Sequence, residues 1–180
     1  MKTRIFGDKK ISIRKLSKGD LRNVKKFQDF INSFVEEKAK IAINRKLSLR
    51  EEREWMKDVL KKLKSRKEIF LFAECDNKII GTTSVELDRW RKSHIGNFGI
   101  TIRNGYRRMG LGKYLMGEIL KLARKELKPK PKIIRLSVYP NNKPAIKLYK
   151  KYGFKDVAKI RKQIQYKGKL LDEIIMLLEV

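Results

Sequence analysis

Apolar positions repeat along the first third of the chain at the spacing of helices. A short strand is predicted around Ile11–Leu16, and after it two stretches carry apolar residues every three or four positions, which is typical of amphipathic helices. Each stretch begins with a serine followed three positions later by an acidic residue, Ser17 with Asp20 and Ser48 with Glu51. This spacing favours a capped helix start.

The rest of the chain alternates between strand-like and helical patterns. Helices are predicted over Gly110–Leu127, which Pro129 follows, and over Pro144–Tyr152, which ends at a glycine, Gly153. The predicted strands are Ile69–Cys75, Ile79–Leu87, His94–Ile102, Ile133–Val138, Val157–Tyr166 and Leu170–Leu178. This order predicts one α/β (α+β) domain over residues 1–180, with a mixed, mostly antiparallel sheet of about seven strands flanked by helices.

Composition adds a strong positive charge to this picture. The 180 residues include 47 Lys and Arg against 20 Asp and Glu, a net charge of +27, which attracts nucleotide cofactors, nucleic acids or anionic membranes without choosing among them. The lone cysteine, Cys75, excludes an internal disulfide or a cysteine-based metal site and fits a reducing compartment. Met1–Arg14 has no signal-peptide core, and no apolar run approaches the ~20 residues that span a bilayer. We therefore expect a cytoplasmic protein.

A glycine-containing turn between a predicted strand and a predicted helix has the features of a phosphate site. The strand ends at Ile102, and the helix begins at Gly110 and Gly112. A helix N-terminus presents unpaired N–H groups and a partial positive charge, and glycines allow a phosphate to approach them. The cations of this segment are Arg103, Arg107, Arg108 and Lys113. The turn lacks the Walker and dinucleotide-fold signatures, and a tight turn with solvated arginines is the alternative interpretation.

Three motifs, in order along the chain, resemble those of the GNAT family of N-acetyltransferases. Arg107–Gly112 matches the signature Arg/Gln-x-x-Gly-x-Gly/Ala, after a strand and before a helix. Asn142–Tyr149 followed by Tyr152–Phe154 resembles the family's Asn-x-x-Ala helix and Tyr-x-x-x-Gly-Phe ending. Asp172–Met176 resembles its last Asp-x-x-x-Met strand. The resemblance covers nearly the whole chain and implies the acyl-CoA N-acyltransferase fold.

The resemblance also implies acetyl-coenzyme A (acetyl-CoA) as cosubstrate and assigns residues to it. Backbone N–H groups of Met109–Lys113 are expected to hold the pyrophosphate, and the backbone of Thr101 and Ile102 to pair with the pantetheine arm where strands splay. Asn142 is expected to contact this arm and Tyr149 to lie near the sulfur. The full set implied for coenzyme binding is Thr101, Ile102, Arg107, Arg108, Met109, Gly110, Leu111, Gly112, Lys113, Asn142 and Tyr149.

Acetyl transfer to an amine requires proton movement that side chains can assist. An alkyl ammonium with a pKa of about 10 must lose a proton before the amine can attack the thioester. A phenol that donates a proton or a hydrogen bond makes the departure of the thiolate easier. The resemblance gives that task to Tyr149, whose ring could instead only pack. A backbone N–H near Ile102 is expected to stabilise the oxyanion. Glu86 and His94 are the candidate bases, with a water chain as the alternative.

The amine acceptor is left open by the sequence. Acceptor regions implied by the resemblance are Phe30–Leu49 and Glu86–Ile95, which carry charges of both signs. A small-molecule or amino-acid acetyltransferase is one hypothesis, and a protein acetyltransferase docking on a ribosomal or chromatin target through its basic surface is another. The third is a non-enzymatic nucleic-acid binder, for which the support is the basic run Lys121, Arg124, Lys125, Lys128, Lys130 and Lys132. The last hairpin could pair two chains into a homodimer.

Overall fold

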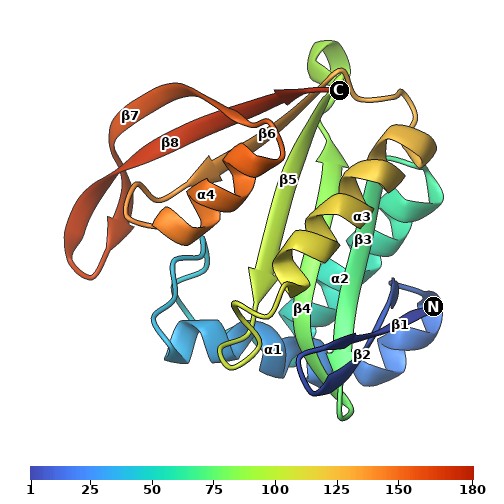
Figure 1. The fold of residues 1–180 in the computed structure, drawn as a ribbon. Helices are drawn as coiled ribbons and strands as arrows, with labels where there is room; N and C mark the ends of the chain where they lie inside the picture. Colours follow the sequence, from blue (N-terminus) through green and yellow to red (C-terminus); the bar gives the residue numbers. More distant parts are fainter.

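A computed structural model describes residues 1–180 and shows one sheet of eight strands with helices on both faces (Figure 1). The strands are β1 (Lys2–Phe6), β2 (Lys9–Lys15), β3 (Glu68–Cys75), β4 (Lys78–Leu87), β5 (Ile95–Ile102), β6 (Ile133–Val138), β7 (Lys155–Tyr166) and β8 (Lys169–Glu179). Their order across the sheet is β1-β2-β3-β4-β5-β6-β8-β7. All neighbours are antiparallel except β5 and β6, which are parallel. The mixed, mostly antiparallel sheet is confirmed, with one strand more than expected.

The additional strand is β1, at the edge of the sheet. It pairs with β2 through a tight turn at Gly7, whose φ is +62°. Residues Lys2–Ile5 are exposed, so β1 carries no alternation between buried and solvated positions that a sequence pattern could report. Backbone pairing with β2 therefore defines this strand.

Four helices cover the sheet, two on each face. On one face lie α1 (Val24–Glu36) and α2 (Leu49–Lys64), and on the other lie α3 (Leu111–Glu126) and α4 (Lys143–Lys151) (Figure 1). Strand β3 sends alternate side chains to the two faces of the sheet. Phe70 and Phe72 pack in the core beside α1 and α2, and Ile69 and Leu71 pack in the core beside α3. Burial on both faces explains why β3 is almost continuously apolar. None of these helices combines the length and apolar character that a membrane-spanning helix requires.

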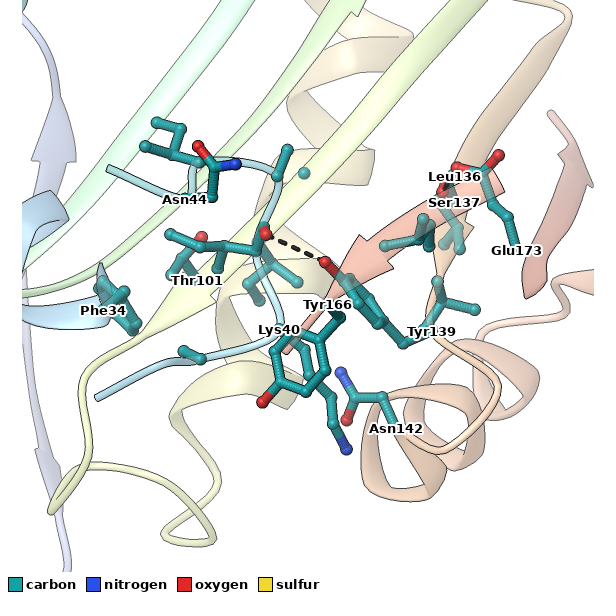
Figure 2. Close-up of a pocket in the computed structure, with 18 of the residues that line it drawn as sticks. Phe34, Lys40, Asn44, Thr101, Leu136, Ser137, Tyr139, Asn142, Tyr166 and Glu173 are labelled. Atoms are coloured by element: carbon teal, nitrogen blue, oxygen red, sulfur yellow. Dashed lines mark hydrogen bonds between the residues drawn. The ribbon is translucent and has the colours of Figure 1, made fainter. Parts of the chain in front are cut away.

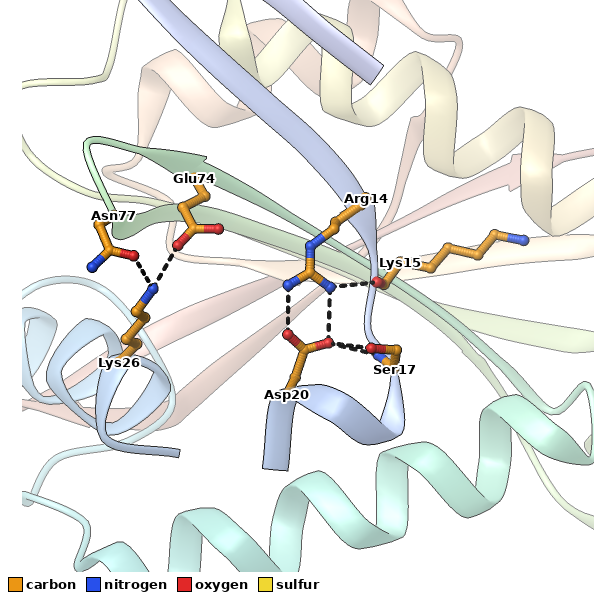
Figure 3. Close-up of polar contacts among 7 residues, drawn as sticks. All are labelled: Arg14, Lys15, Ser17, Asp20, Lys26, Glu74 and Asn77. Atoms are coloured by element: carbon orange, nitrogen blue, oxygen red, sulfur yellow. Dashed lines mark hydrogen bonds and ion pairs between the residues drawn. The ribbon is translucent and has the colours of Figure 1, made fainter. Parts of the chain in front are cut away.

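Polar contacts connect the first helical segment to the sheet (Figure 3). The Asp20 carboxylate accepts hydrogen bonds from the Ser17 N–H at 2.8 Å and the Arg14 guanidinium at 2.8 Å, and Lys26 forms an ion pair with Glu74 at 2.9 Å. A 3₁₀ turn over Lys18–Asn23 precedes α1 here, where a helix was expected directly after Ser17. The expected cap of α2 is confirmed by reciprocal bonds between residues 48 and 51.

The parallel strands β5 and β6 part after three residues. Their pairing covers only Ile95–Asn97 with Ile133–Arg135, while the other edge of β6 pairs with β8 along its whole length, Ile133–Val138. At the point of parting, the Asn97 amide oxygen accepts hydrogen bonds from Arg135 at 2.7 and 3.1 Å, and Arg135 pairs with Asp88 at 3.2 Å. This network holds the strands together just before they separate, and the separation leaves one edge of β5 free beside a cleft.

Candidate active site

Two adjoining cavities occupy the cleft where β5 and β6 part. The larger, of about 1040 Å³, lies between β5, the end of β6, the α1–α2 loop and the β7–β8 hairpin (Figure 2). The smaller, of about 720 Å³, lies between the end of β5 and the first turns of α3 and α4. Ile100, Asn142 and Tyr149 line both cavities, so a ligand can extend from one into the other.

Residues of the turn predicted to bind phosphate, 103–113, line the smaller cavity, and this segment is called here the phosphate-binding turn. Helix α3 begins after Gly110, which has a φ of +91° and provides no side-chain cap, so the first N–H groups of a 16-residue helix stay unpaired. Arg108 also adopts a positive φ, of +65°. At Gly112 the requirement is space, because a Cβ would lie 3.1 Å from the Ile102 Cδ1 atom. The turn therefore presents backbone donors at the N-terminus of a helix, a favourable place for a phosphate.

Three cations of this turn, Arg107, Arg108 and Lys113, line the smaller cavity. Arg108 and Lys113 line the smaller cavity and take part in none of the ion pairs of the structure. Arg107 is occupied: its Nε donates to the Ile102 carbonyl at 2.7 Å, and its terminal nitrogens bind Glu37 at 2.5 and 3.0 Å. Arg107 thus joins the end of α1 to the end of β5 while it also lines the smaller cavity, and its contact with phosphate stays a prediction from the sequence.

Two residues predicted for the pyrophosphate turn their side chains inward. Leu111 is 1% exposed and belongs to an apolar cluster under the N-terminal strands, and Met109 packs against the same cluster. Only their backbone N–H groups can face a ligand. Gly110 and Gly112 line the smaller cavity together with Lys113, and pyrophosphate binding at this position stays a prediction from the sequence.

The free edge of β5 presents alternate peptide groups to the cleft. The Arg103 N–H donates to β4 at 2.8 Å, and because peptide directions alternate along an antiparallel pair, the Thr101 peptide also faces β4. The N–H and C=O groups of Ile100 and Ile102 consequently face the parting. The expected backbone pairing through Thr101 is therefore corrected: Thr101 lines both cavities, while Ile100 takes its place at the free edge.

Tyr149 lies at the junction of the two cavities. Its side chain is 7% exposed and packs edge-on against Phe98, with ring centroids 5.9 Å apart, and near Phe154. Burial alone raises the pKa of Tyr149 to about 12, with no hydrogen bond or neighbouring charge contributing. The hydroxyl keeps its proton at neutral pH and can donate a hydrogen bond. Asn142, which precedes α4, lies at the same junction.

Both bases expected from the sequence lie outside the cleft. Glu86 forms an ion pair with Lys62 of α2 at 2.9 Å and lines neither cavity. His94 precedes β5, at the opposite end of that strand from Ile102, and eight residues of strand extend about 26 Å. We correct both assignments. The one carboxylate that lines the larger cavity is Glu173 of β8, which hydrogen bonds to the Ser137 hydroxyl.

Two tyrosines hold the α1–α2 loop over the larger cavity (Figure 2). The Tyr139 hydroxyl donates to the Ile41 carbonyl at 3.1 Å, and the Tyr166 hydroxyl to the Lys38 carbonyl at 2.7 Å. Their rings contact edge to face at 5.7 Å. Sequence reasoning missed these residues. The available signal was two aromatic residues at the ends of predicted strands, which does not reveal their partners.

Sheet, parting strands and phosphate-binding turn together define an α+β protein of the N-acyltransferase fold. The chain belongs to the acetyltransferase (GNAT) family, whose family model matches residues 31–154. The solved structure of yncA from Salmonella typhimurium, described as a putative acetyltransferase with its cofactor acetyl-CoA, superposes with a TM-score of 0.77 at 19% identity, covering 94% of this chain and 93% of that one. This likeness confirms the expected fold.

Two curated relatives match part of the chain. The L-amino acid N-acetyltransferase AaaT of Escherichia coli is 32% identical over 107 residues, which are 59% of this chain and 65% of the relative. An N-alpha-acetyltransferase of Sulfurisphaera tokodaii is 33% identical over 109 residues, 55% of this chain and 64% of the relative. The matched segment thus spans just under two thirds of each relative's length.

Proposed function

We propose that the chain is a single-domain N-acetyltransferase that moves an acetyl group from acetyl-CoA to an α-amino group. The observation that carries this proposal is the continuous cleft, in which Tyr149 separates a phosphate-binding turn from a larger cavity that can take the acceptor. Family membership supports the reaction type, and the acetyl-CoA named for the yncA structure supports the cosubstrate.

The residues of the smaller cavity fit a coenzyme with a pyrophosphate and an extended arm. Unpaired N–H groups at the start of α3, with Arg108 and Lys113, supply donors and charge for the pyrophosphate. Ile100 offers its N–H and C=O to an extended amide-containing arm, and the Ile102 N–H lies on the same edge. Acetyl-CoA, when bound, supplies the acetyl group as a reactive thioester.

Tyr149 and Glu173 are proposed to move the protons. Tyr149 holds its proton on Oη and donates a hydrogen bond to the departing sulfur, a task for which a pKa of about 12 suits a donor that must remain protonated. Glu173 accepts the proton that the acceptor ammonium must lose, directly or through one water. It is the carboxylate that lines the acceptor cavity, which Glu86 does not reach.

The acceptor class follows from what the relatives have in common. The names of these two relatives describe acetylation of an α-amine, on a free amino acid in one case and at an N-alpha position in the other. Lys38, Lys40 and Lys167 line the same cavity as Glu173 and can bind the carboxylate or carbonyl groups that accompany an α-amine. An amino-acid or peptide α-amine is therefore proposed ahead of a polyamine, whose charges these lysines would repel.

The test is a thiol-release assay with purified protein, acetyl-CoA and an acceptor panel. The panel contains L-amino acids, a peptide with a free N-terminus, the same peptide blocked at its N-terminus but carrying a lysine, and spermidine. We expect turnover with the first two. Turnover only with the blocked peptide or spermidine would contradict the α-amine assignment, and turnover with none would contradict the reaction.

Matched variants test the proton acceptor in the same assay. Glu173→Gln is expected to lower turnover at neutral pH, with partial recovery at higher pH because more of the amine is already neutral. Glu179→Gln removes an exposed carboxylate from the same strand, outside both cavities, and is expected to leave turnover unchanged. Equal effects of the two substitutions would remove Glu173 from the mechanism. Cytoplasmic location and homodimer formation through the last hairpin stay predictions from the sequence.

A further inference from the structure

Three loops meet at the end of the sheet opposite the phosphate-binding turn (Figure 1). They connect α2 to β3, β4 to β5, and α3 to β6. Backbone hydrogen bonds join them: the Lys128 N–H donates to the Arg66 carbonyl at 3.0 Å, and the Lys132 N–H donates to the His94 carbonyl at 2.8 Å. The Lys67 ammonium also donates to the Lys128 carbonyl, at 2.9 Å. The three loops therefore form one connected surface.

This surface, named here the basic end, carries eight exposed cations. They are Arg66, Lys67, Arg89, Arg91, Lys92, Lys128, Lys130 and Lys132. None of them forms an ion pair, whereas nearby acids are engaged elsewhere: Asp88 with Arg135, Glu126 with Lys15 and Glu86 with Lys62. Glu179 is the exposed acid that remains beside these loops. The basic end therefore presents a strongly positive field that intramolecular contacts leave uncompensated.

Trp90 lies in the middle of this field. Its side chain is 87% exposed, and its backbone φ of +50° lies in the left-handed region, which is uncommon for a bulky residue. The other tryptophan, Trp55, packs edge-on against Phe70 at 5.4 Å, but Trp90 has no aromatic or cation–π partner in the structure. Arg89, Arg91 and Lys92 flank it. Packing within the protein accounts for neither the exposure nor the backbone conformation of Trp90.

We propose that the basic end is a docking surface for single-stranded RNA, with Trp90 stacking on an unpaired base and the surrounding cations binding the phosphates. Aromatic stacking combined with a positively charged track is the general mode by which proteins bind single strands. Duplex DNA keeps its bases stacked inside the helix, whereas folded RNA regularly exposes unpaired bases in loops. The surface lies away from the cleft, so this proposal does not depend on the proposed acetyl transfer.

Charge complementarity favours RNA over an anionic membrane as the occupant. An interfacial membrane segment combines its cations with a broad apolar face, and Trp90 is flanked by three charged side chains in place of such a face. Binding of single-stranded RNA requires one exposed aromatic ring face and several cations, and the basic end supplies both.

Fluorescence anisotropy with a labelled oligouridine of about 12 nucleotides tests the proposal, with the full chain and a series of salt concentrations. Trp90→Ala is expected to weaken binding about tenfold, and Trp90→Phe to restore most of the affinity because a ring remains. The double variant Arg89→Ala/Arg91→Ala is expected to reduce the slope of log K against log salt by about 1.4, since each phosphate contact on a single strand contributes about 0.7.

A matched double variant at the other end of the sheet controls for net charge. Lys10→Ala/Lys78→Ala removes two exposed, unpaired cations from the β2 and β4 starts and is expected to leave affinity and slope near those of the wild type. The proposal is overturned if Trp90→Ala binds oligouridine like the wild type, or if the two double variants weaken binding equally. It is also overturned if phosphatidylglycerol/phosphatidylcholine vesicles bind in a Trp90-dependent way and oligouridine does not. Unchanged melting temperatures confirm that the variants fold.

Discussion

Substitution of Gly110 separates the two properties of this position, its backbone conformation and its place beside a bound phosphate. Gly110 has a φ of +91°, and an added Cβ would meet only the Phe6 ring, at 4.0 Å. The cost of Gly110→Ala is thus conformational, roughly 1–2 kcal/mol for the left-handed region. That cost corresponds to a fall in melting temperature of about 2–8 °C for a chain of this size. Asn and Asp tolerate this region better, so Gly110→Asn and Gly110→Asp should both melt above Gly110→Ala.

Coenzyme binding should follow a different order. A carboxylate about 5 Å from a phosphate charge, at an effective dielectric constant of 20–80, is disfavoured by roughly 1–3 kcal/mol per charge. Two phosphates then give at least about a thirtyfold loss of affinity. We expect calorimetric titration with acetyl-CoA to show this loss for Gly110→Asp and only a small change for Gly110→Asn. Equal affinities of the Asn and Asp variants would refute the position of the pyrophosphate, and three melting temperatures equal to that of the wild type would refute the conformational argument.

Three further predictions test other parts of the structure. Tyr149→Phe should lower kcat while leaving acetyl-CoA affinity nearly unchanged. Because burial raises the pKa of Tyr149 to about 12, the kcat of the wild type should not decline as pH rises to about 10. A decline in the wild type that Tyr149→Phe lacks would contradict the raised pKa. Burial first, then the neighbouring Glu86 charge, raise the pKa of Glu68 from 4.5 to about 8, so its favourable contribution to stability is complete at acid pH and lost as pH rises through 8. Glu68→Gln should therefore raise the melting temperature at pH 9 and not at pH 5, and an equal shift at both pH values would show that ionisation is not the cause. Arg107→Ala should destabilise the fold more than Glu37→Ala. Their half-exposed ion pair contributes less than about 1 kcal/mol, whereas Arg107 also donates a hydrogen bond to the Ile102 carbonyl. Equal losses of stability in the two variants would count against a contribution from the hydrogen bond to Ile102.

Local patterns predicted most of the fold because most of its elements have one buried side. The helix over Leu111–Glu126 and the strand over Ile133–Val138 match their predicted ranges within one residue, since apolar periodicity reports burial directly. The edge strand β1 has no buried side and gives no such signal. The turn at Gly110 before α3 was also predictable, because its glycines and its position before a helix are local features of the sequence.

The proton-transfer residues required tertiary information. Glu86 and His94 were chosen for their chemistry and their place on central strands, but the pairing of Glu86 with Lys62 and the far position of His94 are set by packing between distant segments. Glu173 approaches the cleft only because the β7–β8 hairpin lies beside β6 and the α1–α2 loop. The direction of each peptide group along β5 likewise follows from the register of β5 with β4. This register places the peptide groups of Ile100 at the free edge, where the sequence had suggested those of Thr101.

The most direct test of the central claim, that this cleft holds acetyl-CoA, is calorimetric titration of the purified chain with acetyl-CoA at moderate salt, with ATP as the anion control. The structure predicts micromolar binding of acetyl-CoA and much weaker binding of ATP, because ATP lacks the arm that pairs with the free edge of β5. Equal and salt-sensitive binding of both ligands would contradict the claim, since it would show that a net charge of +27 attracts any polyanion.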